Sequence, residues 1–365
     1  MKLVTIVGAR PQFIKSAPFS DMFRKGHKEI IIHTGQHYDE NMSDIFFQEL
    51  AIPKPDYFLG VGSGSHGYQT GRMLEKIEQV LLKEKPDGVL VYGDTNSTLA
   101  GALAASKLHI PVFHVEAGLR SYNKQMPEEQ NRILTDHISD LLFCPTKTAV
   151  ENLKREGILD GVLLTGDIMA DAVNRFMNLS NKFYSNGKWL EVLKADNPHL
   201  PQLKEKEYYL ATVHRAENTD DLMKLKCIFT ALEMLDQPVL VPLHPRTRKL
   251  VGELNISFEN VIIIQPVGYL LMLYLTKNAY MVVTDSGGLQ KEAYLLKTPC
   301  TTLRNETEWI ETLENGWNCL CPINIQSILE KASRNLDSLN ETQPQVFGDG
   351  KAALRICQAI VERYA

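Results

Sequence analysis

The 365-residue sequence lacks the features that mark membrane, secreted and nucleic-acid-binding proteins. No stretch approaches the roughly 20 consecutive apolar residues that a membrane-spanning helix needs. The N-terminal apolar run Leu3–Val7 is followed by Gly8, Arg10 and Pro11, whereas a secretory signal has a longer apolar segment. The net charge of −5 gives no overall basic field, so neither nucleic acid nor a membrane is an expected partner.

Cysteine is scarce as well. The chain contains six cysteines, mostly in apolar surroundings, without the regular spacing of a disulfide framework. Cys319 and Cys321 alternate in a predicted strand, but such a pair without a second Cys/His pair nearby indicates a core rather than a metal site. We therefore expect a reduced, cytoplasmic protein without a bound metal.

The chain has the length of about two domains, and its 44% apolar and 23% charged residues are typical of globular proteins. In the first half, short apolar runs alternate with helical patterns, which predicts a parallel sheet covered on both faces. The predicted strands there are Leu3–Val7, Glu29–Thr34, Gly88–Tyr92, Pro111–Val115 and Leu141–Cys144, and the predicted helices include Ile14–Lys25, Tyr68–Lys83 and Ser97–Lys107.

The same rhythm restarts after a polar stretch, Ser180–Lys206, which we interpret as a linker with an irregular helix. The later predicted strands are Tyr208–Thr212, Val239–Leu243, Val261–Ile264, Met281–Thr284 and Thr301–Leu303. We predict an N-terminal Rossmann-like domain over residues 1–175 and a C-terminal one over 176–350. A closing amphipathic helix over 351–365 can pack back on the N-terminal domain.

Polar motifs follow the predicted strands of the first half, at the edge where open parallel sheets bind ligands. Arg10 and Lys15 come after the first strand, where they either hold a diphosphate or are solvated cations of an ordinary turn. Asp94 follows the third strand, where it either caps the next helix or brings a carboxylate to the ligand edge. His114 and Glu116 alternate on one side of the next strand.

A further motif, Met126–Arg132, adds two more carboxylates. Pro127 starts a helix whose first turn carries Glu128 and Glu129, which the helix dipole favours. Glu128 and Arg132 are spaced i,i+4 and share a helix face. Several acids at one edge can supply the general acid–base pairs of proton transfer at carbon.

In the second half, His214 and Arg215 follow the first strand. His214 can hold a proton on a departing phosphate, although a lone histidine is often structural. The strongest local signal is the segment Asp285–Ala293, in which a serine and two glycines open a helix. Free N–H groups at a helix start bind anions, whereas a plain glycine turn is the alternative.

A formal match to the dinucleotide-binding pattern GxGxxG occurs at Gly62–Gly67. The preceding segment is a weak strand that contains Pro55, whereas a dinucleotide fingerprint follows a strong first strand. We therefore interpret this segment as a glycine loop and expect no NAD site.

Together these motifs resemble those of the non-hydrolysing UDP-N-acetylglucosamine 2-epimerases. The resemblance runs in order from GARPQFIK to FGDGKA and includes TGQH, YGDTNST, HVEAGLRS, PEEQNR, HRAEN, PLHPRT, TDSGGLQKEA and LRNETE. It implies two Rossmann-like domains in a GT-B arrangement with the active site in the interdomain cleft, a cytoplasmic homodimer and no cofactor. It further implies inversion at C2 of UDP-GlcNAc to give UDP-ManNAc, by anti elimination of UDP to a 2-acetamidoglucal and re-addition, for cell-surface polysaccharide.

The resemblance also implies roles for individual residues. The catalytic residues would be Asp94, Glu116, Glu128 and His214. The substrate-binding residues would be Arg10, Lys15, Arg132, Arg215, Tyr269, Ser286, Gly287, Gly288, Glu292 and Arg304. An activator site for a second UDP-GlcNAc would use Gln36, His37, Arg72 and His244.

Two positions depart from the family pattern. Ala216 stands where regulated bacterial members usually carry an arginine, which predicts weak or absent activation. Trp309 stands at the arginine of the common TERPE motif, so Arg304 is expected to supply that cation. The resulting TEW form resembles members that act on UDP-2,3-diacetamido sugar acids, so the same chemistry on such a substrate is one alternative. A hydrolysing epimerase, a GT-B glycosyltransferase and a non-catalytic nucleotide-sugar sensor are the others.

Overall fold

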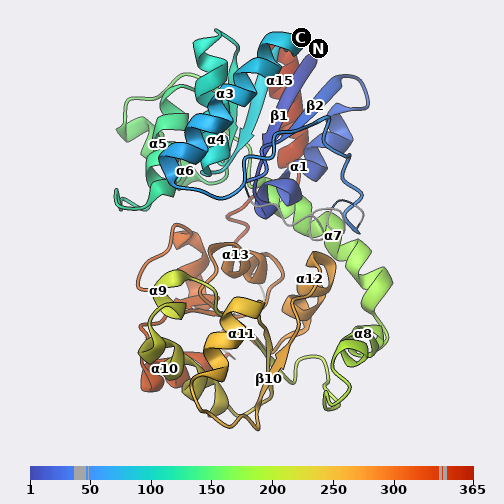
Figure 1. The fold of residues 1–365 in the computed structure, drawn as a ribbon, viewed down its shortest axis with the longest axis vertical. Helices are drawn as coiled ribbons and strands as arrows, with labels where there is room; N and C mark the ends of the chain where they lie inside the picture. The colour runs from blue at the N-terminus through green and yellow to red at the C-terminus, as the bar shows by residue number, and fades with distance from the viewer. Residues whose placement is uncertain (37–46, 48, 337–338, 340–342) are drawn as a thin grey trace. The chain divides into compact units, whose positions relative to one another are not determined.

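The computed structural model describes residues 1–36, 47, 49–336, 339 and 343–365. The chain divides into two compact units, of which unit 1 comprises Met1–Arg175 with Gln345–Ala365 and unit 2 comprises Phe176–Pro344. Each unit is built on one parallel sheet with helices around it (Figure 1). The predicted fold class of two Rossmann-like α/β domains is thereby confirmed.

The sheet of unit 1 has seven strands in the order β3-β2-β1-β4-β5-β6-β7. They are β1 (Lys2–Val7), β2 (Lys28–His33), β3 (Tyr57–Phe58), β4 (Gly88–Tyr92), β5 (Val112–Val115), β6 (Leu141–Cys144) and β7 (Val162–Leu164). The helices are α1 (Arg10–Phe23), α3 (His66–Glu84), α4 (Asn96–Lys107), α5 (Pro127–His137), α6 (Lys147–Arg155) and α15 (Ala352–Tyr364), and α7 (Ile168–Tyr184) contains the boundary with unit 2. The sequence predicted five of these strands but not the very short β3 and β7.

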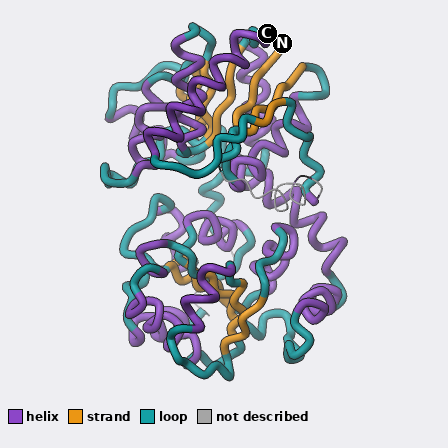
Figure 2. Tube along the Cα trace, viewed as in Figure 1, coloured by secondary structure: helices purple, strands orange, loops and turns teal. Residues whose placement is uncertain are grey.

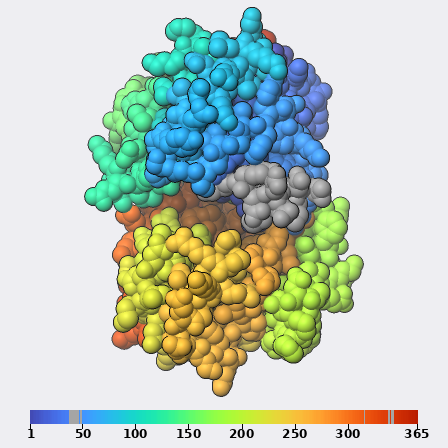
Figure 3. Space-filling model, in the orientation of Figure 1, coloured from blue at the N-terminus to red at the C-terminus, as the bar shows by residue number. Residues whose placement is uncertain are grey.

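Helices cover both faces of this sheet. On one face, α3 and α4 bury an aliphatic cluster that includes Val4, Ile6 and Val91, and the lighter blue atoms of this region form the front of the unit in Figure 3. On the other face, α1 packs against α15. The carboxylate of Asp171 in α7 accepts the first two N–H groups of α15 at 3.0 Å each, so the closing helix belongs to unit 1.

The sheet of unit 2 has six strands in the order β10-β9-β8-β11-β12-β13. They are β8 (Tyr209–Thr212), β9 (Val239–Pro242), β10 (Val261–Ile264), β11 (Met281–Thr284), β12 (Cys300–Thr302) and β13 (Asn318–Leu320). Strands are coloured orange and helices purple in Figure 2. The helices are α8 (Lys188–Asp196), α9 (Ala216–Thr219), α10 (Leu222–Glu233), α11 (Pro245–Gly252), α12 (Tyr269–Asn278), α13 (Gly287–Leu295) and α14 (Ile325–Ala332), with a 3-10 segment η1 (Ile310–Gly316).

The polar stretch Ser180–Lys206 is more regular than the sequence predicted. Helix α7 continues through Ser180 to Tyr184, and α8 follows after three residues. The Ser180 hydroxyl donates to the Leu270 carbonyl at 2.6 Å, and the Trp189 ring lies 5.6 Å from that of Tyr208. Buried tertiary contacts therefore stabilise helices that the local composition does not favour.

Among the residues that the structure describes, no helix combines the length and apolar character required to cross a membrane. All six cysteines are free. Burial raises the pKa of Cys300 to about 12 and that of Cys321 to about 11, so both are thiols at neutral pH.

Candidate active site

Charged side chains of unit 1 gather at the carboxyl ends of β1, β4 and β5. Lys15 of α1 forms a buried ion pair with Glu116, the residue after β5. Arg132 of α5 forms an ion pair with Asp94, two residues after β4. Four residues that the sequence predicted for the site are thus paired at the ligand-binding edge of this sheet.

Gly93 lies beside the Lys15–Glu116 pair and directly precedes Asp94. Its φ of +63° is in the left-handed region that favours glycine. A side chain on Gly93 would lie 3.3 Å from Glu116 Oε2 and 3.8 Å from Lys15 Nζ. Glu116 itself has a φ of +70°, an uncommon conformation for a residue with a side chain. The backbone at Glu116 is therefore strained, as is frequent at functional sites.

Glu129, which the sequence analysis explained only by the helix dipole, holds Arg132 in place. Its carboxylate accepts from Arg132 Nη1 at 2.6 Å and from the backbone N–H groups of Ser121 at 2.9 Å and Tyr122 at 2.8 Å. Burial alone would raise the pKa of Glu129, but these hydrogen bonds and Arg132 lower it. Glu128 lies exposed in the first turn of the same helix.

Gln12 joins the turn after β1 to the turn after β4. Its side-chain oxygen accepts from the backbone N–H groups of Gly8 and Ala9 at 2.8 and 3.0 Å. Its amide nitrogen donates to the Tyr92 carbonyl at 2.7 Å and to Thr98 Oγ1 at 2.9 Å. Gln12 therefore fixes the start of α1, which carries Arg10 and Lys15, relative to the segment with Asp94. The sequence analysis missed this residue, because its partners are distant in the chain.

In unit 2, the buried Asp285 organises the ends of β8 and β11. Its carboxylate accepts from the backbone N–H groups of His214 at 3.1 Å and Arg215 at 3.0 Å, and from Asn218 Nδ2 at 3.1 Å. His214 Nδ1 lies 3.2 Å from the same carboxylate, while its ring remains 56% exposed. The sequence analysis named Asp285 only as the start of a motif. The sequence signal that could have identified Asp285 is a carboxylate directly after a predicted buried strand.

The residues after Asp285 form the expected helix start. Ser286 is the N-cap of α13, and its hydroxyl accepts from Leu289 N at 3.3 Å. Gly287 and Gly288 are the first two residues of the helix, and the predicted substrate-binding residue Glu292 is buried about one turn later. This geometry presents backbone N–H groups and the positive end of a helix dipole.

Arg304 reaches the start of α13 from the loop after β12. Its Nη1 lies 3.1 Å from Glu308 Oε2, and both groups lie against Gly287, where a side chain would meet Glu308 Oε1 at 2.5 Å and Arg304 Nη1 at 3.6 Å. Trp309 follows, and Lys291 Nζ of α13 lies 3.7 Å from the centroid of its ring, in a cation–π contact. Tyr269, the first residue of α12, is buried.

The candidate activator residues lie at several places. Gln36 accepts from the Ser97 backbone N–H at 3.1 Å and from its hydroxyl at 2.6 Å, so it caps the start of α4. Arg72 is exposed and paired with Glu75 at 2.6 Å. His244 is the exposed N-cap residue of α11, and His37 lies outside the described residues.

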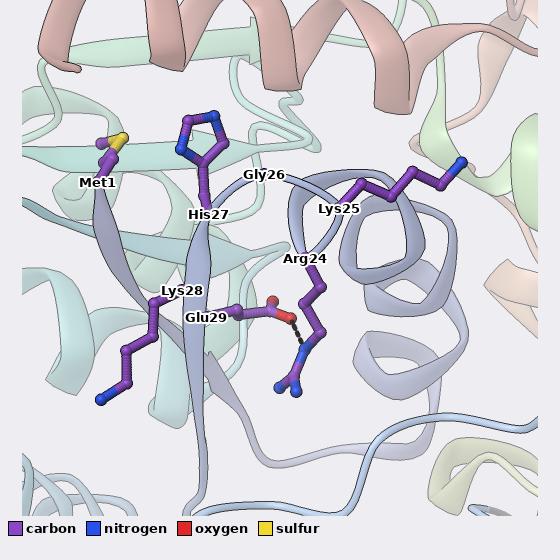
Figure 4. Close-up of a pocket in the computed structure, with 7 residues that line it drawn as sticks. All are labelled: Met1, Arg24, Lys25, Gly26, His27, Lys28 and Glu29. Atoms are coloured by element: carbon purple, nitrogen blue, oxygen red, sulfur yellow. Dashed lines mark hydrogen bonds and ion pairs between the residues drawn. The ribbon is translucent and has the colours of Figure 1, made fainter.

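A surface pocket of unit 1 lies at the opposite edge of the sheet, around the start of β1 and β2 (Figure 4). Arg24 donates from Nε to Glu29 Oε2 at 2.7 Å, while Lys25 and Lys28 point away from each other. The cationic side chains that line this pocket do not converge on a common point. Because parallel sheets bind ligands at the carboxyl ends of their strands, we do not place the active site here.

Comparisons with known proteins agree on one family. The family model described as UDP-N-acetylglucosamine 2-epimerase matches residues 22–361. A Methanococcus maripaludis protein named UDP-N-acetylglucosamine 2-epimerase homolog is 54% identical over 365 residues, 99% of each chain. The UDP-2,3-diacetamido-2,3-dideoxy-D-glucuronate 2-epimerase of Pseudomonas aeruginosa is 48% identical over 370 residues. The aligned region covers 99% of this chain and 100% of the Pseudomonas protein. The Methanocaldococcus jannaschii UDP-GlcNAc 2-epimerase, solved with UDP-GlcNAc and UDP, superposes with a TM-score of 0.87 at 45% identity over 99% of this chain and 100% of that one.

Proposed function

The chain belongs to the UDP-N-acetylglucosamine 2-epimerase family, and from this premise we propose that it interconverts UDP-GlcNAc and UDP-ManNAc without releasing free sugar. The observation that carries the proposal is the pairing of Asp94 and Glu116 with buried cations at adjacent strand ends. Two carboxylates held in this way fit a reaction that moves a proton at carbon and develops positive charge on a sugar ring.

The reaction proceeds by elimination and re-addition. The C–H bond at C2 is weakly acidic, so the bond between C1 and the UDP oxygen breaks first and positive charge develops on the ring. A carboxylate then takes the C2 proton, which leaves UDP and a 2-acetamidoglucal. Return of a proton to the other face of C2 and of UDP oxygen to C1 gives the epimer. The groups that we assign to this chemistry are Asp94, which is paired with Arg132, together with Glu116 and Glu128.

Unit 2 supplies the groups that we assign to the UDP portion. His214, Arg215 and Arg304 provide positive charge or a proton for the diphosphate, with Arg10 and Lys15 of unit 1. Backbone N–H groups at Ser286–Gly288 donate hydrogen bonds to phosphate oxygens, as those at helix starts commonly do. We further assign Glu292 to the ribose hydroxyls and Tyr269 to the nucleotide.

A UDP-2,3-diacetamido-uronate is the second candidate substrate. Trp309, which replaces the usual arginine and stacks on Lys291, favours it, and the Pseudomonas aeruginosa relative is named for such a substrate. Incubation with each nucleotide sugar in the absence of an acceptor, followed by NMR of the products, tests both. We expect UDP-ManNAc from UDP-GlcNAc. Turnover of the uronate alone would reassign the substrate, and free sugar would indicate a hydrolysing enzyme. A substrate left unchanged until an acceptor is added would indicate a glycosyltransferase.

We also propose that the protein is a cytoplasmic homodimer that supplies precursors for cell-surface polysaccharide. The six free thiols support a reducing compartment. Light scattering coupled to gel filtration tests the dimer, for which we expect twice the mass of the 41.2 kDa chain.

We infer that activation by a second UDP-GlcNAc is weak or absent. Ala216, the first residue of α9, places a methyl group where regulated members carry a guanidinium. Arg246, a cation that could substitute, is paired with Asp220 at 2.8 Å. Loss of a charge-assisted hydrogen bond of about 1.5–3 kcal/mol weakens binding by roughly ten- to a hundredfold.

A further inference from the structure

His114, the third residue of β5, makes two hydrogen bonds to groups that only accept. Its Nδ1 lies 2.7 Å from Asp136 Oδ1, and its Nε2 lies 2.7 Å from the carbonyl oxygen of Gly93. The side chains of His114 and Asp136 are both fully buried. Because neither a carboxylate nor a backbone carbonyl offers a proton, both ring nitrogens must carry one. The hydrogen-bond partners thus assign His114 as an imidazolium with Asp136 as its counter-ion.

Further contacts hold Asp136 as a carboxylate. Its second oxygen accepts from Arg120 Nη1 at 2.7 Å and from the backbone N–H of Gly118 at 3.1 Å. Arg120 also forms a two-point ion pair with Glu156, at 2.7 and 2.6 Å. Burial by itself would raise the pKa of Asp136, but the adjacent His114 and Arg120 lower it. The four side chains alternate in charge, so the buried imidazolium is compensated.

The bond from His114 to Gly93 connects this buried network to the candidate site. Gly93 directly precedes Asp94, and a side chain on Gly93 would lie 3.3 Å from Glu116 Oε2. His114 itself precedes Glu116 by two positions on the same segment. Its Nε2–H group therefore ties the end of β4, which carries one candidate carboxylate, to the end of β5, which carries the other.

We propose that His114 is a positioning residue, which fixes the Gly93 carbonyl and thereby the relative placement of the Asp94 and Glu116 carboxylates. This inference rests on the proposed 2-epimerase function, because these carboxylates are the groups assigned to the sugar. Asp136 sets the ring orientation and keeps both nitrogens protonated, whereas the bond to Gly93 does the positioning. A displacement of about 1 Å in such groups can lower a rate about 10²-fold.

Two amide variants separate the two hydrogen bonds. In His114→Gln, the amide nitrogen replaces Nε2 and can still donate to Gly93. In His114→Asn, it replaces Nδ1 and can donate only to Asp136. We expect kcat to fall about 10²-fold in His114→Asn but less than about tenfold in His114→Gln. KM and the affinity for UDP should stay within about twofold in both, because the groups assigned to UDP are largely elsewhere.

His137→Gln is the matched control. His137 lies on α5, 3.5 Å from Glu156 of the same network, but is 47% exposed. The His137→Gln variant should keep the wild-type kcat. Equal kcat in the Gln and Asn variants would overturn the positioning role, as would a loss of UDP affinity that accompanies the loss of kcat. A wild-type protein that does not epimerise would instead refute the proposed function.

Nitrogen NMR of the protein labelled with ¹⁵N-histidine tests the imidazolium independently of activity. The His114 signals are assigned as those missing from the His114→Gln spectrum. At neutral pH, both His114 ring nitrogens should show the shift of a protonated nitrogen. An unprotonated shift at either nitrogen would overturn the assignment, whether or not the protein is active.

Discussion

The two units prepare their ligand-binding edges by different means. In unit 1, charged side chains at the strand ends are paired with one another, as Lys15 is with Glu116 and Arg132 with Asp94. In unit 2, one buried carboxylate, Asp285, organises backbone N–H groups, and His214 remains largely exposed. Unit 1 thus presents ions that are paired with one another, and unit 2 presents backbone N–H groups at a helix start with Arg215 and Arg304 nearby.

This difference matches the two halves of the proposed substrate. A sugar ring that gains positive charge only in the transition state is stabilised best by carboxylates fixed in advance. A diphosphate is charged before it binds, and a helix start with free N–H groups binds it without a buried charge. The first arrangement should act on turnover and the second on affinity, and the following predictions test this separation.

The largest effect is expected from the carboxylates of unit 1. Asp94→Asn and Glu116→Gln should each lower kcat by about 10²–10⁴-fold, the usual contribution of a general acid or base. The dissociation constant of UDP, measured by calorimetry, should change little. Asp21→Asn, which alters an exposed ion pair with Arg175 in the same unit, is the control. Near-normal turnover in either variant would remove that residue from the catalytic set.

A stability prediction concerns His33, the buried last residue of β2. Burial lowers the pKa of His33 from 6.5 to about 4, so the unfolded chain binds a proton that the folded chain does not. Stability is therefore complete above about pH 6.5 and decreases by about 3 kcal/mol as the pH falls to about 4.

His33→Asn keeps an acceptor for the Gly35 N–H, which lies 2.9 Å from His33 Nδ1, but has no group that titrates in this range. Its unfolding free energy in urea should decrease less between neutral pH and about pH 5 than that of the wild type. Parallel curves for His33→Asn and the wild type would contradict the prediction.

A smaller effect is expected from the centre of unit 2. Asp285→Asn removes the charge that holds the His214 and Arg215 N–H groups, so UDP should bind roughly ten- to a hundredfold more weakly. At saturating substrate, kcat should change less than the affinity. Asp236→Asn is the control, because Asp236 accepts from the Tyr209 hydroxyl at 2.9 Å near the other end of β8. A large loss of kcat with normal UDP affinity would remove the proposed separation of roles.

The smallest effect concerns regulation. Initial rates in the UDP-ManNAc to UDP-GlcNAc direction should be nearly hyperbolic for the wild type, with or without trace UDP-GlcNAc. Ala216→Arg should introduce activation by that trace of about tenfold, the lower end of the roughly ten- to hundredfold effect of one charge-assisted bond. An absolute requirement of the wild type for trace UDP-GlcNAc would show that Ala216 is no obstacle to activation.

The sequence predicted the parts of the fold that depend on local pattern. Strands such as Gly88–Tyr92 and Met281–Thr284 are continuous apolar runs, and the serine and glycines after Asp285 are a local helix-start signal. The two-residue β3 lacks such a pattern, because its place depends on pairing with β2. Likewise, helix α8 depends on contacts of Trp189 with distant aromatic residues.

The partners within the candidate site were harder to predict. Gln12 and the Tyr92 carbonyl are 80 positions apart, and Asp285 and Asn218 are 67 apart. No periodic pattern reports such hydrogen bonds, which form only when the sheet aligns its strand ends. The sequence therefore indicated which strand ends carry charge, but not that Glu129 holds Arg132 or that His114 contacts Gly93.

The most direct test of the central claim is the reaction of UDP-GlcNAc in deuterium oxide, followed by proton NMR and mass spectrometry of the nucleotide sugars. Elimination of UDP and re-addition predict that UDP-ManNAc forms with deuterium at C2, because the proton removed from C2 exchanges with solvent before a proton returns. The uridine diphosphate should remain attached to the sugar in the product. A product that retains hydrogen at C2, or free sugar as the main product, would contradict the non-hydrolysing 2-epimerase mechanism.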